Sequence, residues 1–224
     1  MRMVALSTLV GLSLLAAPVR ACDLALALAV DISGSVDAAE FEIQMRGLAE
    51  GLRDPEVAEA LARGQAAVTL IQWTGSSRQA VAVPWTRVTS PVEVAALAAR
   101  IEATGRIWAI YSTAIGEALQ FTAASFAEVP DCERRVIDVS GDGPSNEGVE
   151  PADVRASLTG QRITVNALVI EDGVRSLREY FRKNVIVGPG AFVVVANSFA
   201  DYPDRMREKL RRETERQLSL LSGR

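Results

Sequence analysis

Histidine is absent from all 224 residues of this chain, and cysteine occurs only twice. Without an imidazole there can be no Ser-His-Asp or Cys-His nucleophilic site, and no zinc, copper or non-haem iron held by histidine. Two cysteines alone are too few for a structural zinc site or an iron–sulfur cluster. The side chains that remain for chemistry carry oxygen, which points to carboxylates, hydroxyls and hard cations.

Aromatic residues are also scarce, at 5%, yet apolar residues make up 49% of the chain and charged residues 23%. This composition is enough to bury a sizeable core, and it excludes a disordered or collagen-like chain. The length is compatible with one large α/β domain or with two small domains.

The first 21 residues have the pattern of a secretory signal peptide. A short basic segment, Met1–Met3, precedes 14 mainly apolar residues from Val4 to Ala17, and short side chains before a cut after Ala21 are typical of a cleavage site. This apolar run is too short for a comfortable membrane span, and no later stretch is long enough for one. We therefore expect a signal peptide at residues 1–21.

Cleavage would leave residues 22–224 as the mature domain, either periplasmic or secreted. It removes two arginines and no acid, so 22 basic residues remain against 28 acidic ones and the formal charge becomes −6. Such a protein lacks the basic excess with which nucleic-acid-binding proteins displace counterions. A lipoprotein with Cys22 at its start is an alternative to free export, although Arg20 is a poor match to the small residues of a lipobox.

Strands and helices alternate along the mature chain. Short unbroken apolar runs predict buried strands, and apolar residues at helical spacing predict helices between them. Pro84 indicates that one strand is an antiparallel arm at the edge of the sheet. The pattern predicts a single doubly wound, Rossmann-like α/β domain, with a mostly parallel sheet, helices on both faces and one antiparallel edge strand. The expected strands are Leu24–Val30, Ala67–Trp73, Gln79–Trp85, Arg135–Ser140, Ile163–Ile170 and Phe192–Ala196, and the expected helices are Asp37–Leu52, Pro55–Arg63, Ser90–Ala103, Thr113–Ala127, Pro151–Leu158, Leu177–Arg182 and Pro203–Leu221.

Oxygen-bearing side chains follow the predicted strands at the point where those strands end. Asp31, Ser33 and Ser35 form a D-x-S-x-S pattern after the first strand, Asp142 follows the fourth, and Thr113 opens a helix between them. Ligands of open α/β sheets bind beyond the carboxyl ends of the strands, and such a donor set suits a small hard cation. Each residue alone also has a purely structural explanation, as a helix N-cap or a turn former.

The whole pattern resembles the metal-ion-dependent adhesion site of von Willebrand factor A domains. The resemblance rests on D-x-S-x-S after an apolar first strand, a threonine opening a middle helix and an aspartate closing the next strand, and it covers about Leu24–Leu221. The chain is similar in particular to a group of exported bacterial A-domain proteins, through segments 30–36, 135–144 and 188–192.

The resemblance implies a role for each matched residue. Ser33 and Ser35 would bind the cation through their hydroxyls, Thr113 directly or through water, and Asp31 and Asp142 would hold coordinated waters or one of them would bind directly. The cation would be Mg²⁺, or else Mn²⁺ or Ca²⁺. Because two carboxylates leave a divalent site near neutral, an acidic group of a partner protein or cell-surface polymer would complete the coordination. The implied function is an exported binding module and not an enzyme.

Two features near this site are particular to the chain. Asp142 stands in Gly-Asp-Gly-Pro, where the family more commonly has Thr-Asp-Gly, so the loop 143–148 can shape the rim of the site differently. Trp108 and Tyr111, shortly before Thr113, would either form an apolar rim beside the metal or belong to the core.

The two cysteines would lie in an oxidising compartment after export, where an even number favours a disulfide between Cys22 and Cys132. In the strand order of A domains the first and fourth strands are parallel neighbours. The resemblance therefore implies that both cysteines lie at the same amino-terminal edge of the sheet.

Two other interpretations use the same residues. Asp31 and the Gly-Asp-Gly around Asp142 are also similar to the nucleophile and magnesium site of haloacid dehalogenase-type phosphohydrolases. Those enzymes need an acid where this chain has Ser33, and a lysine that is hard to supply because only Lys183 and Lys209 exist. The third interpretation is a structural module whose site no longer binds metal.

Overall fold

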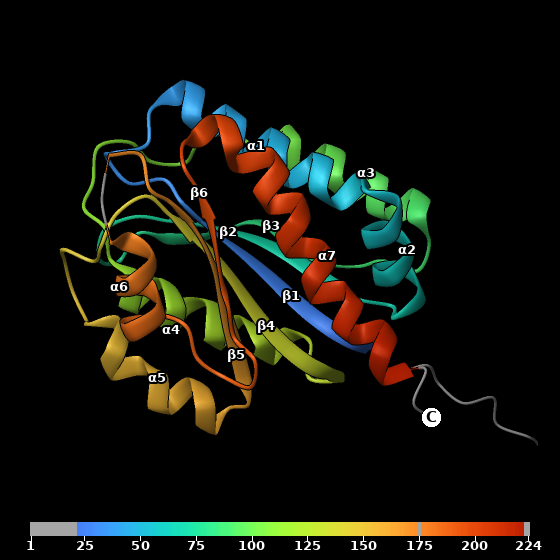
Figure 1. Ribbon diagram of the computed structural model, residues 1–224. Coiled ribbons are helices and arrows are strands. Elements are labelled where there is room, and N and C mark those ends of the chain that lie inside the picture. Colours follow the sequence, from blue (N-terminus) through green and yellow to red (C-terminus); the bar gives the residue numbers. More distant parts are fainter. Residues whose placement is uncertain (1–21, 174–175, 222–224) are drawn as a thin grey trace, which may run out of the picture.

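A six-stranded sheet forms the centre of the molecule in the computed structural model, which describes residues 22–173 and 176–221 (Figure 1). The order across the sheet is β3-β2-β1-β4-β5-β6, and every neighbouring pair is parallel except β2 with β3. The predicted fold class, including the antiparallel edge strand, is confirmed. The predicted signal peptide lies outside the described residues. The strands are β1 (Cys22–Asp31), β2 (Ala67–Trp73), β3 (Gln79–Arg87), β4 (Cys132–Gly141), β5 (Ile163–Ile170) and β6 (Val193–Ala196).

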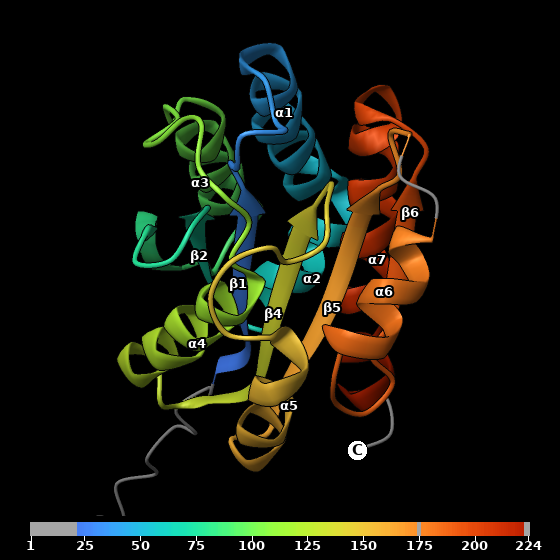
Figure 2. The same cartoon turned by 90° about the vertical axis from the view of Figure 1, so that its left-hand side faces the viewer.

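Helices cover both faces of the sheet (Figures 1 and 2). One face is covered by α1 (Ala38–Arg53), α2 (Pro55–Arg63), α3 (Pro91–Glu102) and α7 (Tyr202–Leu221), and the other by α4 (Ile115–Ser125), α5 (Pro151–Gly160) and α6 (Leu177–Asn184). Short 3₁₀ turns precede β4 and α7, at Phe126–Glu128 and Phe199–Asp201. Within the described residues, none of the helices combines the length and apolar character needed to span a membrane.

Strand β1 divides the core into two parts through the alternation of its side chains. Leu24, Leu26 and Leu28 pack with α1, α2, α3 and α7, whereas the alanines between them pack with the α4 side. Successive strand residues point to opposite faces, so the larger side chains fill the space under four helices and the smaller ones let α4 come close. Both faces of β1 are buried, as expected for a central parallel strand.

Several element boundaries differ by one to three residues from the sequence-based expectation, and two of them affect the disulfide and the candidate site. Strand β4 begins at Cys132, three residues earlier than predicted, because its amino end continues to pair with β1 as far as Cys22. Helix α4 begins at Ile115, two residues later than predicted, and its N-cap is Ala114, which has no side-chain capping bond. The hydroxyl of Thr113 therefore does not cap this helix.

Helix α7 is attached to the sheet by a buried cluster of charges. The ammonium group of Lys209 forms ion pairs with Asp138 in the middle of β4 and, at 2.9 Å, with Glu213, and all three side chains are buried. Asn166 of β5 donates a hydrogen bond of 2.9 Å to the same Glu213 oxygen. Burial alone would lower the pKa of Lys209, but the two carboxylates together raise it. The lysine therefore stays charged inside the protein and holds α7 to β4.

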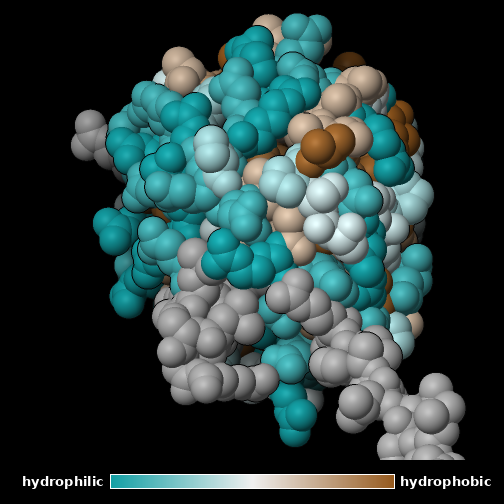
Figure 3. All heavy atoms as spheres, turned by 90° about the vertical axis from the view of Figure 1, so that its right-hand side faces the viewer, coloured by the Kyte–Doolittle hydropathy of each residue, from teal (hydrophilic) through white to brown (hydrophobic). Residues whose placement is uncertain are grey.

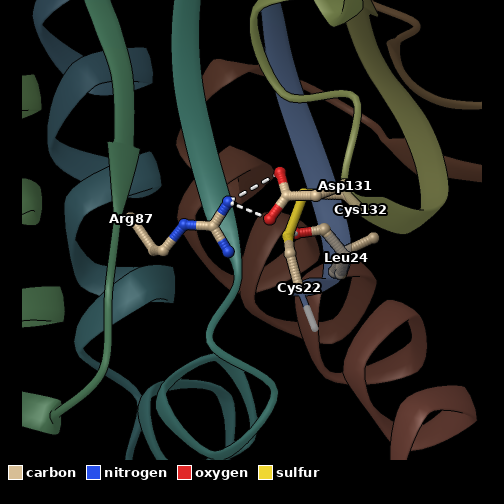
Figure 4. Close-up of a disulfide and its surroundings, with 5 residues drawn as sticks. All are labelled: Cys22, Leu24, Arg87, Asp131 and Cys132. Carbon is tan, nitrogen blue, oxygen red and sulfur yellow. Dashed lines mark hydrogen bonds and ion pairs between the residues drawn. A yellow bond between two sulfur atoms is a disulfide. The ribbon is translucent and has the colours of Figure 1, made fainter. Parts of the chain in front are cut away.

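The expected disulfide is present between Cys22 and Cys132, which are register partners at the amino ends of β1 and β4 (Figure 4). Next to it, Nη2 of Arg87 at the end of β3 donates to both carboxylate oxygens of Asp131, at 2.9 Å each. The bond joins positions 110 residues apart and links the start of the described chain to the centre of the sheet.

Replacing both cysteines by serine should lower the free energy of unfolding by about 5 kcal/mol, because the unfolded chain regains the entropy of a long closed loop. Urea unfolding of the oxidised protein and of the Cys22→Ser/Cys132→Ser variant measures this difference. Alkylation of the native, unreduced protein should label no thiol, and labelling of two thiols would contradict the assignment.

Candidate metal site

The carboxyl ends of β1 and β4 bring four of the five proposed ligands together. The two strands are neighbours with Val30 opposite Ser140, so Asp31 and Asp142 follow on adjacent strands. Ser35 donates a hydrogen bond of 2.7 Å to Asp142 Oδ1, and the hydroxyls of Ser33 and Ser35 lie 3.3 Å apart. In Figure 2 the carboxyl ends of the strands, marked by the arrowheads, show this edge of the sheet.

Asp31 is a buried carboxylate with one oxygen left unsatisfied. Its Oδ1 accepts a hydrogen bond of 2.7 Å from the backbone N–H of Ser33, but Oδ2 has no hydrogen-bond partner within the described residues. Burial, and next the charge of Asp142, raise the pKa of Asp31 to about 7, although the bonds from Ser33 oppose this shift. A buried carboxylate oxygen without a partner is costly, and a cation beside it would remove that cost.

Gly141 makes room next to this oxygen. A Cβ at position 141 would lie 3.1 Å from Asp31 Oδ2, which is tighter than ordinary contacts. The missing side chain therefore keeps the space beside Asp31 open. The neighbouring Asp142 is less deeply buried, and desolvation raises its pKa while the Ser35 hydroxyl lowers it. Both carboxyl groups thus lie in surroundings that penalise their negative charge.

Thr113 is held at the same edge through its backbone. Its N–H donates to Asn146 Oδ1 at 2.9 Å, and its carbonyl accepts from the Asn146 N–H at 2.9 Å and from the Ser145 hydroxyl at 3.2 Å. These residues belong to the loop after β4, directly beyond Asp142. Within the part of the chain that the structure describes, no hydrogen bond joins Thr113 to the other four residues.

Three supporting residues were missed by sequence reasoning. Arg106 donates to the carbonyls of Ile32 and Ser33, at 2.8 Å each, and so clamps the D-x-S-x-S loop. Ser145 and Asn146 clamp Thr113, yet in the sequence they look like ordinary turn residues. No local pattern marks these roles, because each one depends on a contact more than 30 residues away.

The sequence left open whether Trp108 and Tyr111 form an apolar rim or belong to the core, and the structure places them differently. Trp108 is partly buried and packs against the core. Tyr111 is exposed, with the Arg78 guanidinium 3.9 Å from its ring centroid.

No group of three or more acidic or cysteine side chains that could hold a metal occurs within the described residues. A cation at this edge would therefore depend on two carboxylates and on hydroxyls. Oxygen ligands of this kind fit a hard cation, and the unsatisfied oxygen of Asp31 provides a place for it.

Residues 21–218 match the model of a family described as "Protein of unknown function (DUF1194)". The chain belongs to this family. No curated protein matches the sequence.

Several solved structures share the fold. Proximal thread matrix protein 1 from the mussel byssus superposes with a TM-score of 0.65 at 19% identity, over 85% of this chain and 47% of that one. A second structure of that protein, with a zinc-occupied MIDAS motif, has a TM-score of 0.59 at 19% identity, over 85% and 48%. A von Willebrand factor type A structure from Catenulispora acidiphila gives 0.60 at 18% identity, over 84% and 42%. This chain spans about half the length of these structures, and at such identities the likeness shows the fold alone, which is that of a von Willebrand factor A domain.

Close contact between α4 and the loop after β4 depends on Gly116. A Cβ at this position would lie 2.1 Å from the carbonyl oxygen of Val149, so Gly116→Ala must displace the loop backbone. We expect a loss of about 1–3 kcal/mol in the free energy of unfolding, measured by urea denaturation. Gly160→Ala is the matched control because an added Cβ there meets nothing within 4 Å. Equal stability of the two variants would contradict this account of the loop.

Proposed function

We propose that this protein is an exported, cation-dependent binding module, with residues 22–224 as its mature domain in the periplasm or outside the cell. It binds a divalent cation, Mg²⁺ in the first place and Mn²⁺ or Ca²⁺ as alternatives. The ligands are Asp31, Ser33, Ser35, Thr113 and Asp142, and the bound cation captures an acidic group of a partner protein or surface polymer.

The unsatisfied Oδ2 of Asp31 is the observation that carries this proposal. The Asp31 carboxylate is fully buried, one of its oxygens is unpaired, and a second carboxylate lies nearby. Without a cation, such a group destabilises the fold. Hydroxyl oxygens of Ser33 and Ser35 lie at the same place and complete a donor set of the kind hard cations take. The zinc-occupied MIDAS motif in the mussel protein of the same fold supports the proposal.

The residues of the chain prepare this site before any ligand arrives. The Ser33 N–H holds Asp31 through Oδ1, which leaves Oδ2 for the cation, and the Ser35 hydroxyl orients Asp142. Arg106 fixes the backbone between them. When bound, a divalent cation would offset the two carboxylates and accept a further oxygen ligand. Since the site is then near neutral, a carboxylate from a partner would be attracted to it.

The phosphohydrolase alternative finds less support. The position of its general acid is taken by Ser33, whose hydroxyl lies 3.3 Å from that of Ser35 and is a poor proton donor near neutral pH. Lys209, one of the two lysines of the chain, is paired with Asp138 and Glu213 inside the protein.

Millimolar Mg²⁺ should raise the melting temperature of the protein relative to EDTA. Selective binding to the folded state contributes about 2.7 kcal/mol at a hundredfold excess over the dissociation constant. Asp31→Ala should abolish the shift, because it removes the buried carboxylate, and Ser35→Ala should weaken it less. Thermal melts of the three proteins in Mg²⁺, Mn²⁺ and EDTA measure these effects.

Glu42→Ala serves as the matched control, since it removes an exposed carboxylate from α1, and it should keep the full shift. If the parent protein shows no cation-dependent shift, the site does not bind metal and the structural-module interpretation is correct.

The mature protein should not hydrolyse p-nitrophenyl phosphate in Mg²⁺, because it lacks an acid at position 33. The measurement is the absorbance of released p-nitrophenol at 400 nm, recorded at neutral pH over a period on the order of hours. Turnover that disappears in the Asp31→Ala variant would favour the phosphohydrolase instead.

A further inference from the structure

Apolar side chains are exposed beside the candidate metal site. Ile110 is 87% exposed, Ile107 43% and Tyr111 41%, and all three come from the loop between α3 and α4. We call these three residues the apolar rim. On the opposite side of the molecule, the atoms that are not grey belong mainly to hydrophilic residues (Figure 3). Three of the large apolar side chains that are exposed in the described residues thus lie on one loop.

Ile110 is unfavourable in two ways within the isolated protein. Its φ of +63° is in the left-handed region, which β-branched residues rarely adopt. Its side chain is almost fully exposed, so burial does not offset this strain. Glycine or asparagine would fit the same backbone with less strain. Strained residues of this kind cluster at ligand-binding positions. The strain at Ile110 therefore indicates a contact with a molecule outside this chain.

The surrounding loop is held firmly in this strained shape. Gly34 donates to the carbonyl of Tyr111 at 2.8 Å, and Thr74 donates through its hydroxyl to the carbonyl of Ser112 at 2.9 Å. The side chain of Gln72 accepts from the N–H of Ile107 at 2.9 Å. Ile110 is thus presented from a tethered loop, so its binding would cost little ordering entropy.

The rim directly adjoins the D-x-S-x-S segment. A Cβ at Gly34 would lie 3.5 Å from Ile110 Cα and 3.3 Å from the Tyr111 carbonyl. Gly34 stands between Ser33 and Ser35, so the rim backbone touches the loop that carries two proposed ligands. A partner group at the cation and a partner group on Ile110 would be neighbours.

We propose that the apolar rim binds a bulky apolar side chain of a protein partner, next to the acidic residue that the cation captures. This inference rests on the proposed function and makes its partner more specific. The occupant is a surface segment that carries Asp or Glu and, within about two positions, Ile, Leu, Phe, Tyr or Trp. Side chains this close in sequence can reach the cation and the adjoining Ile110 at the same time. An anionic polysaccharide supplies the acid but no bulky apolar group for Ile110.

The first test is the stability of the free protein in EDTA. Ile110→Asn and Ile110→Gly should raise the melting temperature, because both residues adopt positive φ more easily. Val92→Asn is the matched control: Val92 is 78% exposed in the first turn of α3 and has no positive φ. It should give no such rise. A lower melting temperature for both Ile110 variants would show that Ile110 serves the fold, and would overturn the proposal.

The second test is selection of binding peptides. A phage library of disulfide-cyclised heptapeptides is selected on the mature protein in Mg²⁺ and eluted with EDTA. The recovered peptides should combine an acid with a bulky apolar residue, and Ile110→Asn should weaken their binding at least tenfold, whereas Val92→Asn should not. Recovery of acidic peptides without apolar enrichment, of no EDTA-eluted peptide, or of peptides insensitive to Ile110→Asn would each overturn the proposal.

Polygalacturonate is the probe for the polysaccharide alternative. The polymer could bind in a Mg²⁺-dependent way, more strongly than the peptides and equally well to Ile110→Asn. This result would assign the site to a polymer and overturn the proposal for the apolar rim. Failure of the proposed function is distinguishable, because the parent protein would then show no Mg²⁺-dependent melting shift at all.

Discussion

The parallel pairing of β1 with β4 is the constraint on which both ends of the molecule depend. At the amino end it places Cys22 opposite Cys132, and at the carboxyl end it places Val30 opposite Ser140. Strand residues advance by a nearly constant rise, so the register held by the disulfide at one end is the register that brings Asp31 and Asp142 together at the other. A slip of one residue would turn the Leu and Ala faces of β1 towards the wrong helices.

Two buried aspartates on this pair of strands differ in whether a cationic side chain of the protein compensates their charge. Asp138, in the middle of β4, has its cation within the chain, because Lys209 of α7 reaches it. Asp31 has no ion pair in the part of the chain that the structure describes. The nearby Arg106 donates its hydrogen bonds to backbone carbonyls, and its charge lowers the pKa of Asp31 less than burial raises it. Buried charges persist in proteins when they are paired or bind metal. The contrast supports an external cation at Asp31.

The loops at the carboxyl edge show how the fold can carry an unfavourable site. Gly116 and Gly148 allow the loop after β4 to lie against α4, where a Cβ on either glycine would collide with Val149 or Glu117. The loop between α3 and α4 is tied to Gln72 of β2 and to Thr74 directly after this strand. These tethers hold strained and desolvated groups in place, and the apolar core beneath provides the stability that offsets their cost.

Local patterns determined much of this protein. Apolar runs and helical spacing predicted each strand and helix to within a few residues, and the D-x-S-x-S segment together with Asp142 predicted which residues would meet at the carboxyl edge. The apolar runs and the helical spacing are short-range, so the sequence alone carries them. The meeting of Ser35 with Asp142, which lie 107 residues apart, was expected instead from the position of ligands at strand ends and from the family resemblance. The clamps from Arg106, Ser145 and Asn146, and the Lys209 cluster, were decided by the tertiary structure. Each joins segments far apart in the chain, and whether an arginine or a lysine is buried or exposed depends on which distant residues pack around it.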